Sequence, residues 1–411
     1  MKKPKIRFKG FTETWEQRKL EEICESFEYG LNAAAKEYDG ENKYIRITDI
    51  DDNSHEFIQD DVTSPDIDLT NSENYQLKYG DVLFTRTGAS VGKTYIYKES
   101  DGLVYYAGFL IRGRVKSNYS PEFIFQNTLT DDYDKFIRIT SQRSGQPGVN
   151  AQEYASYEIS VPKFEEQQKI GAYFSTLDHL ITLHQRKCEN LKKLKKFMLQ
   201  KLFPQNGENV PKIRFSNFTD TWEQRKLGDM GSTFTGLSGK NKNDFGHGKA
   251  KFVTYMNVFT NSIANLEMTD NIEIDNKQNE VKYGDVFFTT SSETPDEVGM
   301  SSVWLGNKQN IYLNSFCFGF RPSVKINEYY LAYMLRSDCV RKKITYLAQG
   351  ISRYNISKNK MMNIEIPLTN YLEQQKIGTL FSELDNLITL HQSKCDNLKE
   401  LKKYMLQNMF I

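Results

Sequence analysis

The sequence predicts an α+β protein in which two globular domains with mixed or antiparallel sheets are separated by two long helices. A long segment, residues 165–203, returns almost unchanged as residues 372–410. The segment KIRFKGFTETWEQRKL, which starts at Lys5, returns as KIRFSNFTDTWEQRKL at Lys212. Between these repeats lie short runs of β-type residues separated by Gly, Asn and Asp, a pattern typical of strands joined by tight turns. The repeated unit is therefore an entire half-chain.

The two long helices are predicted from apolar residues that recur at alternating spacings of four and three, the pattern of a coiled-coil seam. Each copy carries a histidine and a cysteine at the same places in the pattern, and the cysteines are expected to be small apolar core residues. We expect the seam to consist of Ile170, Phe174, Leu177, Ile181, His184, Cys188, Leu191, Ile377, Phe381, Leu384, Ile388, His391, Cys395 and Leu398.

A partner is needed for each helix, because at about 1.5 Å per residue a helix of this length is too long for a small domain to cover. Two like units in one chain usually pack about a pseudo-twofold axis, by the logic of an isologous dimer. Such an axis would make the helices antiparallel and place one globular domain at each end. The sequence therefore predicts an antiparallel coiled coil with a pseudo-twofold internal repeat.

Five segments follow from these landmarks. The expected order is a first globular domain (1–162), a central long helix (163–203), a polar linker bounded by prolines (204–211), a second globular domain (212–367) and a C-terminal long helix (368–411).

Within the globular domains, short apolar and β-branched runs predict strands, and longer stretches with helical spacing predict helices. Helices are expected over 121–140 and 327–348. The expected strands are 43–48, 81–85, 94–97, 110–115, 252–255, 286–289 and 317–320.

Composition excludes several classes of protein. No run of about 18 apolar residues occurs, and the first residues, MKKPKIRFKG, lack the apolar core of a secretory signal, so we expect a cytoplasmic protein. The five cysteines form no CxxC pair, which favours reduced thiols and no structural metal. The net charge of +1 neither requires nor excludes nucleic acid.

Catalytic motifs are missing or incomplete. The segment Gly88–Thr94 has three residues between its glycines where a P-loop needs four, and a turn between two strands is the better interpretation. The chain contains no Pro-Pro pair, which argues against the motif with which an adenine methyltransferase grips a flipped base. We therefore expect no enzymatic activity.

Taken together, the paired EQQKI and LITLHQ helices, the paired FT(E/D)TWEQRKL segments and the paired YGDV turns at Tyr79 and Tyr283 resemble the specificity subunit of a Type I restriction-modification system. The resemblance covers essentially the whole chain. It implies a non-catalytic subunit whose two target-recognition domains each read half of a bipartite, asymmetric site in double-stranded DNA while the helices set the spacing. It also implies two methyltransferase (modification) subunits and restriction subunits as partners, with AdoMet, ATP and magnesium bound by those partners.

Arginine and glutamine suit base edges, whereas serine, tyrosine and lysine suit phosphates. The resemblance implies DNA-binding residues, which we expect in the turn after residue 85, in the loops before the last strand of each domain and in a Gly/Asn-rich loop. The candidates are Arg86, Thr87, Ser90, Lys93, Arg143, Ser144, Gln146, Lys240, Lys242, Ser291, Ser292, Arg353 and Tyr354. Trp15 and Trp222 are candidates for contact with a partner subunit.

One alternative remains at this point. A pseudo-dimeric scaffold that binds proteins at its two ends, and no DNA, would also explain a duplicated frame with two different domains.

Overall fold

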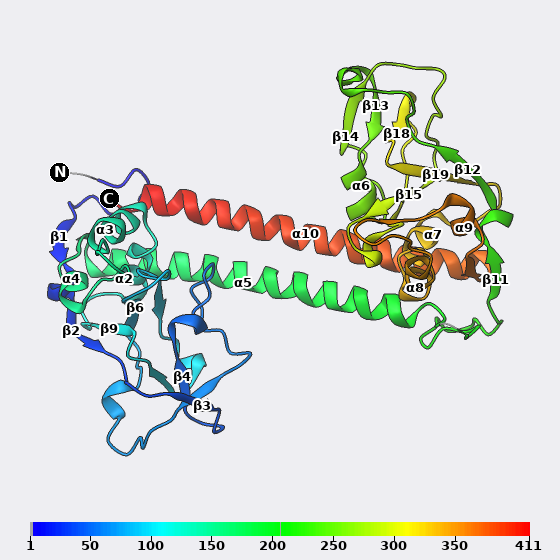
Figure 1. The fold of residues 1–411 in the computed structure, drawn as a ribbon. Coiled ribbons are helices and arrows are strands. Elements are labelled where there is room, and N and C mark those ends of the chain that lie inside the picture. The colour runs from blue at the N-terminus through cyan, green and yellow to red at the C-terminus, as the bar shows by residue number, and fades with distance from the viewer. Residues whose placement is uncertain (1–2, 206) are drawn as a thin grey trace. The chain divides into compact units, whose positions relative to one another are not determined.

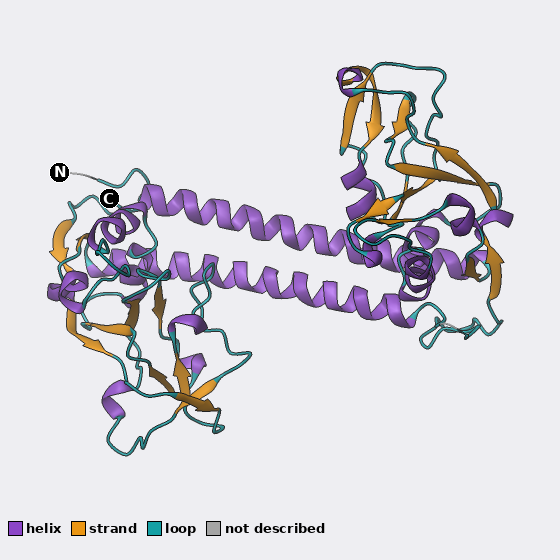
Figure 2. Ribbon diagram, viewed as in Figure 1, coloured by secondary structure: helices purple, strands orange, loops and turns teal. Residues whose placement is uncertain are grey.

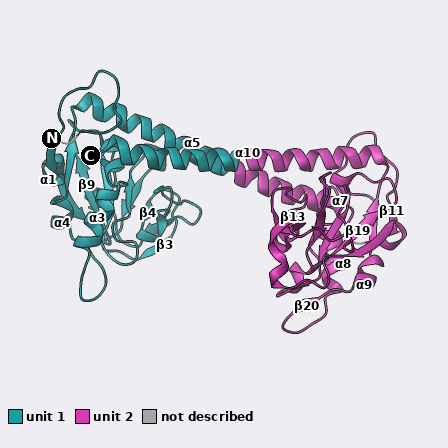
Figure 3. Cartoon of the chain, turned by 90° about the horizontal axis from the view of Figure 1, so that it is seen from above, with its two compact units in different colours: residues 1–186, 391–411 teal, residues 187–390 magenta. Residues whose placement is uncertain are grey.

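The computed structural model describes residues 3–205 and 207–411 (Figures 1 and 2). It divides into two compact units, one formed by residues 1–186 and 391–411 and the other by residues 187–390 (Figure 3). Each unit contains a globular domain and one half of each long helix. The boundaries of the compact units therefore differ from those of the predicted segments. Each long helix is divided between the two units, because each globular domain packs on both helices.

The long helices are α5 (Phe164–Lys201) and α10 (Tyr371–Met409), which start and end within three residues of their predicted bounds. The other elements of the first unit are β1 (Glu16–Lys19), α1 (Leu20–Ile23), β2 (Cys24–Tyr29), β3 (Ala35–Glu37), β4 (Lys43–Ile45), β5 (Thr63–Pro65), β6 (Asp81–Thr85), β7 (Thr94–Ile96), β8 (Val104–Tyr106), β9 (Leu110–Val115), α2 (Pro121–Asn127), α3 (Asp131–Thr140), α4 (Ala151–Ala155) and β10 (Glu158–Val161).

The second unit follows a similar order, but its second sheet has three strands where that of the first unit has four. Its elements are β11 (Glu223–Lys226), β12 (Gly231–Thr235), β13 (Phe245–Val253), α6 (Tyr255–Thr260), β14 (Thr269–Ile272), β15 (Val286–Thr289), β16 (Ser291–Ser292), β17 (Ser301–Val303), β18 (Ile311–Leu313), β19 (Cys317–Pro322), α7 (Glu328–Met334), α8 (Asp338–Tyr346), β20 (Tyr354–Asn355), α9 (Lys358–Met362) and β21 (Glu365–Leu368).

Each domain has its own four-stranded main sheet, and the two sheets have the same topology. The strand order is β2-β9-β6-β7 in the first and β12-β19-β15-β17 in the second, and all neighbours are antiparallel. A second sheet in each domain contains one parallel pair, β4 with β8 and β13 with β18. The prediction of an α+β fold with mixed or antiparallel sheets is confirmed.

The repeated sequence segments form the frame on which each domain is mounted. Arg7 donates two hydrogen bonds to Glu166 at the start of α5, at 2.6 and 2.7 Å. Arg214 does the same to Glu373 at the start of α10, at 2.7 and 2.8 Å. In each repeat, an ion pair thus joins the KIRF segment to the start of the long helix that carries the EQQ motif.

The YGDV landmarks are also structural. Asp81 and Asp285 are buried, and each accepts two hydrogen bonds from an arginine of the neighbouring strand, Arg114 and Arg321 respectively, at 2.7 or 2.8 Å. The preceding glycine has a φ of 93° in the first copy and 82° in the second, a conformation that favours glycine. The motif therefore fixes a turn and an ion pair in each domain.

In the first unit the two helix halves run in opposite directions. Along α5, Phe174 packs near Phe410, which follows α10, Asp178 pairs with Lys402 at 2.6 Å, and His184 Nδ1 lies 2.8 Å from His391 Nδ1. In the second unit the order is also inverted. Cys188 Sγ approaches the Ile388 carbonyl, Lys195 pairs with Asp385 at 2.5 Å, and Phe203 stacks on Phe381. All fourteen predicted seam residues are buried or half-buried.

A glycine in each long helix allows the start of a domain helix to pack closely. At Gly378 an added Cβ would lie 2.8 Å from the Tyr330 nitrogen and 2.6 Å from Asn327 Oδ1. Asn327 is the N-cap of α7 and accepts a hydrogen bond from the same nitrogen. Gly171 has the same role against Ser120 and Phe123.

The substitution Gly378→Ala should therefore destabilise the second unit, although alanine favours a helix. Overpacking against backbone outweighs the gain in propensity, and we expect a net loss of about 1–2 kcal/mol in unfolding free energy, measured by denaturant unfolding. Gly145→Ala is the control, because a Cβ there meets nothing within 4 Å and its φ is not positive. Equal stability of the two variants would contradict the close packing.

No helix in the described part of the chain is both long enough and apolar enough to cross a membrane. All five cysteines are buried.

Candidate nucleic-acid interface

Three segments meet at one edge of the main sheet in the first domain. The nitrogen of Arg86, just after β6, donates to the carbonyl of Phe109 at 3.1 Å, and the Arg86 carbonyl accepts from Val149 at 2.9 Å. Residues 142–147 project from this point as a loop, which the Gly148 N–H closes by donating to the Ser141 carbonyl at 3.1 Å.

The second domain repeats this geometry with a different sequence. Thr290, just after β15, donates to the Phe316 carbonyl at 3.1 Å and accepts from Ile356 at 3.0 Å. The projecting loop is closed by two hydrogen bonds between the backbones of Gln349 and Asn355, at 2.8 and 3.0 Å. We call these places the loop edges of the two domains, and define them as residues 86–90, 108–109 and 142–148 in the first and residues 290–294, 315–316 and 349–354 in the second.

Large side chains are exposed on both loop edges. Phe109 is 60% exposed and Phe316, its counterpart in the repeat, is 61% exposed. In the second domain Ile351 is 97% exposed at the tip of the loop, and Arg353 is exposed beside it. Apolar and basic side chains at the tip of a rigidly based loop suit insertion into a DNA groove.

The predicted DNA-binding residues of the first domain lie in different environments. Ser144 and Gln146 are exposed on the loop. Arg143 is bound by Glu153 at 2.6 Å, and Arg86 lies over the Tyr29 ring, so these arginines anchor the loop edge. Thr87 Oγ1 donates weakly to Pro147, and Ser90 lies in the turn between β6 and β7.

Lys93 does not fit the phosphate contact expected from the sequence. Its ammonium donates to the Ile50 carbonyl and to Asp52, both at 2.7 Å, and its side chain is only 11% exposed. The Gly88–Thr94 segment is the hairpin turn that the sequence favoured over a P-loop.

Among the predicted residues of the second domain, Arg353 alone is both exposed and on the loop edge, and its side chain forms no hydrogen bond or ion pair with any described residue. Ser291 and Ser292 are buried in β16, so the expectation that they contact DNA is wrong. Tyr354 packs against the core.

The two predicted lysines of the Gly/Asn-rich loop lie in the segment that leads into β13. Lys240 pairs with Asp275 at 2.7 Å and holds the pKa of that carboxyl well below its ordinary value, whereas Lys242 is exposed.

The tryptophans are core residues. Trp222 is buried between Phe203 and Tyr330, so its predicted contact with a partner subunit is wrong. Trp15 is half-buried and packs edge-on against Phe123.

Phe109 and Phe316 were missed by the sequence analysis. They lie 207 residues apart, the offset of the long repeats, inside domains that otherwise share little. A phenylalanine that occurs at the same place in two otherwise different domains could have been used to select these positions from the sequence.

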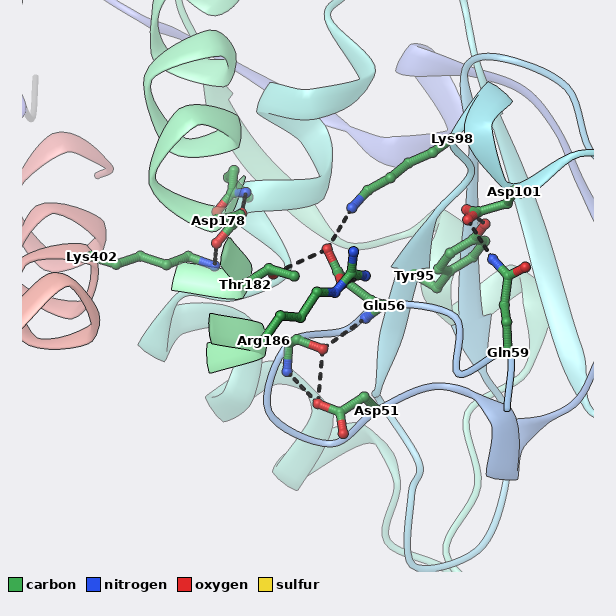
Figure 4. Close-up of polar contacts among 12 residues, drawn as sticks. Asp51, Glu56, Gln59, Tyr95, Lys98, Asp101, Asp178, Thr182, Arg186 and Lys402 are labelled. Atoms are coloured by element: carbon green, nitrogen blue, oxygen red, sulfur yellow. Dashed lines mark hydrogen bonds and ion pairs between the residues drawn. The ribbon is translucent and has the colours of Figure 1, made fainter. Parts of the chain in front are cut away.

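A loop of the first domain holds the domain against α5 (Figure 4). Glu56 accepts hydrogen bonds from Lys98 at 2.9 Å and from Thr182 of α5 at 3.3 Å. Arg186 lies within 3.9 Å of the same carboxylate. The orientation of the first loop edge relative to its helix is therefore defined by side-chain contacts as well as by the core.

Comparisons with known proteins agree with this architecture. The sequence profile of the Type I restriction modification DNA specificity domain matches residues 12–193 and 219–400. The chain is 23% identical over 393 residues to the Type I restriction enzyme MjaVIII specificity subunit of Methanocaldococcus jannaschii, covering 86% of this chain and 83% of that one.

Two solved structures have the same fold. The S subunit of a Type I restriction-modification system from M. genitalium aligns over 100% of this chain and 99% of its own, with a TM-score of 0.62 and 11% identity. A chain from a study of complex assembly and conformational transition of the type I R-M system aligns over 96% and 97%, with a TM-score of 0.51 and 16% identity. Because the family profile matches both halves of the chain, over residues 12–193 and 219–400, the chain belongs to the Type I restriction modification DNA specificity domain family.

Proposed function

We propose that the chain is the DNA-recognition subunit of a Type I restriction-modification system and directs its partners to a bipartite, asymmetric site. Each loop edge reads one half-site, and α5 and α10 together set the distance between the half-sites. The observation that carries this proposal is the contrast between frame and loop edge. The bonds that mount the two domains are the same, whereas the loops they present, QRSGQP and QGISRY, differ in sequence and chemistry.

The spacing role rests on the inverted order of contacts in each unit. We infer an antiparallel coiled coil about a pseudo-twofold axis. Two kinds of contact support it: the ion pairs Asp178–Lys402 and Lys195–Asp385 are equivalent in the repeat, and so are the two members of the His184–His391 contact. DNA has local twofold axes, so two domains related in this way would each face one groove segment and leave the intervening base pairs unread.

The same proposal assigns the chemistry to other chains. Two methyltransferase subunits and the restriction subunits would bind AdoMet, ATP and magnesium, and this chain would contribute binding to double-stranded DNA and no catalytic group.

The first experiment is a mobility-shift assay of the full chain co-expressed with its methyltransferase, followed by methylome sequencing of the host to define the target. Retention of the target duplex in excess unrelated DNA is expected. A complex that shows no sequence-dependent retention would instead support a protein-binding scaffold.

Once the target is known, the loop edges can be tested one at a time. Arg353→Ala should weaken target binding by roughly 5- to 150-fold, the range for loss of a good base contact, and relax selection only in the half-site read by the second domain. Phe109→Ala should act only on the other half-site. Lys93→Gln is the control, because Lys93 is held within the domain, and its target selection should be unchanged. If Arg353→Ala leaves base selection intact in both half-sites, the loop edge is not the reader.

A further inference from the structure

The second unit contains a basic pocket at the junction of α5, α8 and α10. Its volume is about 930 Å³. Three acidic residues line it, Asp296, Asp338 and Asp385. The basic residues that line it are Lys192, Lys195, Lys196, Arg336, Arg341 and Lys342. The pocket therefore carries an excess of positive charge.

Two of these cations are held in place without a carboxylate partner. Arg336 donates to the carbonyls of Val258, Phe259, Asn261 and Ser301, and Arg341 donates to those of Asp296, Val298 and Gly299. Among residues 3–205 and 207–411, no carboxylate lies within ion-pairing distance of either guanidinium. Burial lowers the pKa of each arginine to about 10, so both remain charged at neutral pH.

Three lysines of the pocket are available to a ligand. Lys195 is paired with Asp385 at 2.5 Å. Lys192, Lys196 and Lys342 are exposed, and their side chains form no ion pair or hydrogen bond with any residue that the structure describes. Half-buried guanidinium groups that form no ion pair with a described carboxylate, next to exposed lysines, create a positive potential suited to an anion.

A comparison with the first unit shows that the second domain supplies the additional charge. The equivalent pocket there has a volume of about 270 Å³, and its helix lysines, Lys399, Lys402 and Lys403, are the counterparts of Lys192, Lys195 and Lys196. The first domain faces them with neutral and acidic residues, including Asn53, Ser54 and Asp131. Equivalent lysines of a long helix line both pockets, but only the second pocket is also lined by arginines.

Resting on the proposed function, we propose that this pocket binds phosphate groups of the DNA backbone beside the second half-site, with Lys192, Lys196 and Lys342 as the contacts. Lys192 and Lys196 are four residues apart on one face of α5, about 6 Å along its axis, a distance that spans about two phosphates of one strand. A row of cations suits a phosphate row better than a single free anion. Because only the second pocket has this excess of positive charge, the protein would make more phosphate contacts beside the second half-site than beside the first.

The test measures how binding of the target duplex falls with salt, using the full chain with its methyltransferase subunits. The magnitude of the negative slope of log Kobs against log salt should fall by about 2 for Lys192→Gln/Lys196→Gln and by about 1 for Lys342→Gln, with base selection unchanged. Lys187→Gln/Lys193→Gln is the control, because both lysines are exposed on the same helix outside the pocket. Its slope should match the wild type. Equal unfolding midpoints for all variants confirm that folding is unaffected.

Calorimetry without DNA distinguishes the phosphate backbone from a free polyphosphate. Pyrophosphate and ATP at millimolar concentration should give no saturable heat, and saturable binding lost in Lys192→Gln/Lys196→Gln would show that a free polyphosphate is the ligand instead. If the salt slopes of these variants equal that of a wild type that selects its target, the pocket assignment alone is overturned. A wild type that selects no target would overturn the proposed function itself.

Discussion

A chain in which residues 20–157 replace residues 227–364 is expected to recognise a symmetric target, with the first half-site present twice in inverted orientation. The frame allows this exchange because the junctions are the same in both halves. Leu20 donates to the Tyr157 carbonyl at 2.9 Å, and Leu227 donates to the Ile364 carbonyl at 3.0 Å. The flanking strands β1 and β11 both read EQRK and pair with β10 and β21 in equivalent register.

The first domain, when placed in the second position, should also form its usual hydrogen bond with the long helix, here α10. In the first unit Ser120 donates its N–H to Gln167, and in the second Asn327 donates to Gln374, at 3.1 and 3.0 Å. Because Gln167 and Gln374 are counterparts, a first domain mounted on α10 keeps this bond.

Methylome sequencing of a host that carries the exchanged chain and its methyltransferase provides the measurement. The expected motif is an inverted repeat with the natural spacing, because the helices are unchanged. The control carries the same exchange with Phe109→Ala in both copies and should lose selection on both sides together. Recognition of the original asymmetric target by the exchanged chain would contradict the assignment of one half-site to each domain.

The strands of the main sheet were predictable where buried apolar residues dominate. The predicted bounds of 81–85, 110–115 and 286–289 contain β6, β9 and β15. The strands β2 and β12, CESFEY and GSTFT, were missed because they carry charged or small residues on a half-exposed edge of the sheet. Periodicity identifies strands that are buried on both faces or alternate cleanly, and these two do neither.

The candidate site was predictable only in outline. Matching positions before the last strand led to the two loops, but the sequence could not show that Glu153 holds Arg143 or that Asp52 holds Lys93. Both carboxylates are contributed by separate segments, and an ion pair of this kind depends on tertiary packing. The basic pocket could not be predicted from the sequence for the same reason. Arg336 and Arg341 are close to each other in the sequence but far from Lys192 and Lys196, and the four residues line one pocket only in the folded chain.

The substitution Glu373→Gln is expected to reduce the unfolding free energy of the second unit by about 3 kcal/mol. Glu373 is fully buried and accepts both hydrogen bonds of the Arg214 fork, while the Arg214 side chain is only 11% exposed. Loss of the carboxylate charge leaves a guanidinium that is largely shielded from water and has no counter-ion. This is the situation in which breaking an ion pair destabilises most.

A double-mutant cycle distinguishes the ion pair from simple packing. Arg214→Met/Glu373→Met should be more stable than Glu373→Met alone, because the double substitution leaves no unpaired charge. Denaturant unfolding of the full chain gives the free energies, and hydrogen exchange at the first turns of α10 locates the loss in the frame. Glu22→Gln, which breaks the exposed pair with Arg18, is the control and should leave stability unchanged. If Glu373→Gln behaves like this control, the KIRF segment is not what secures the domain to its helix, and the motif is repeated for a reason other than this ion pair.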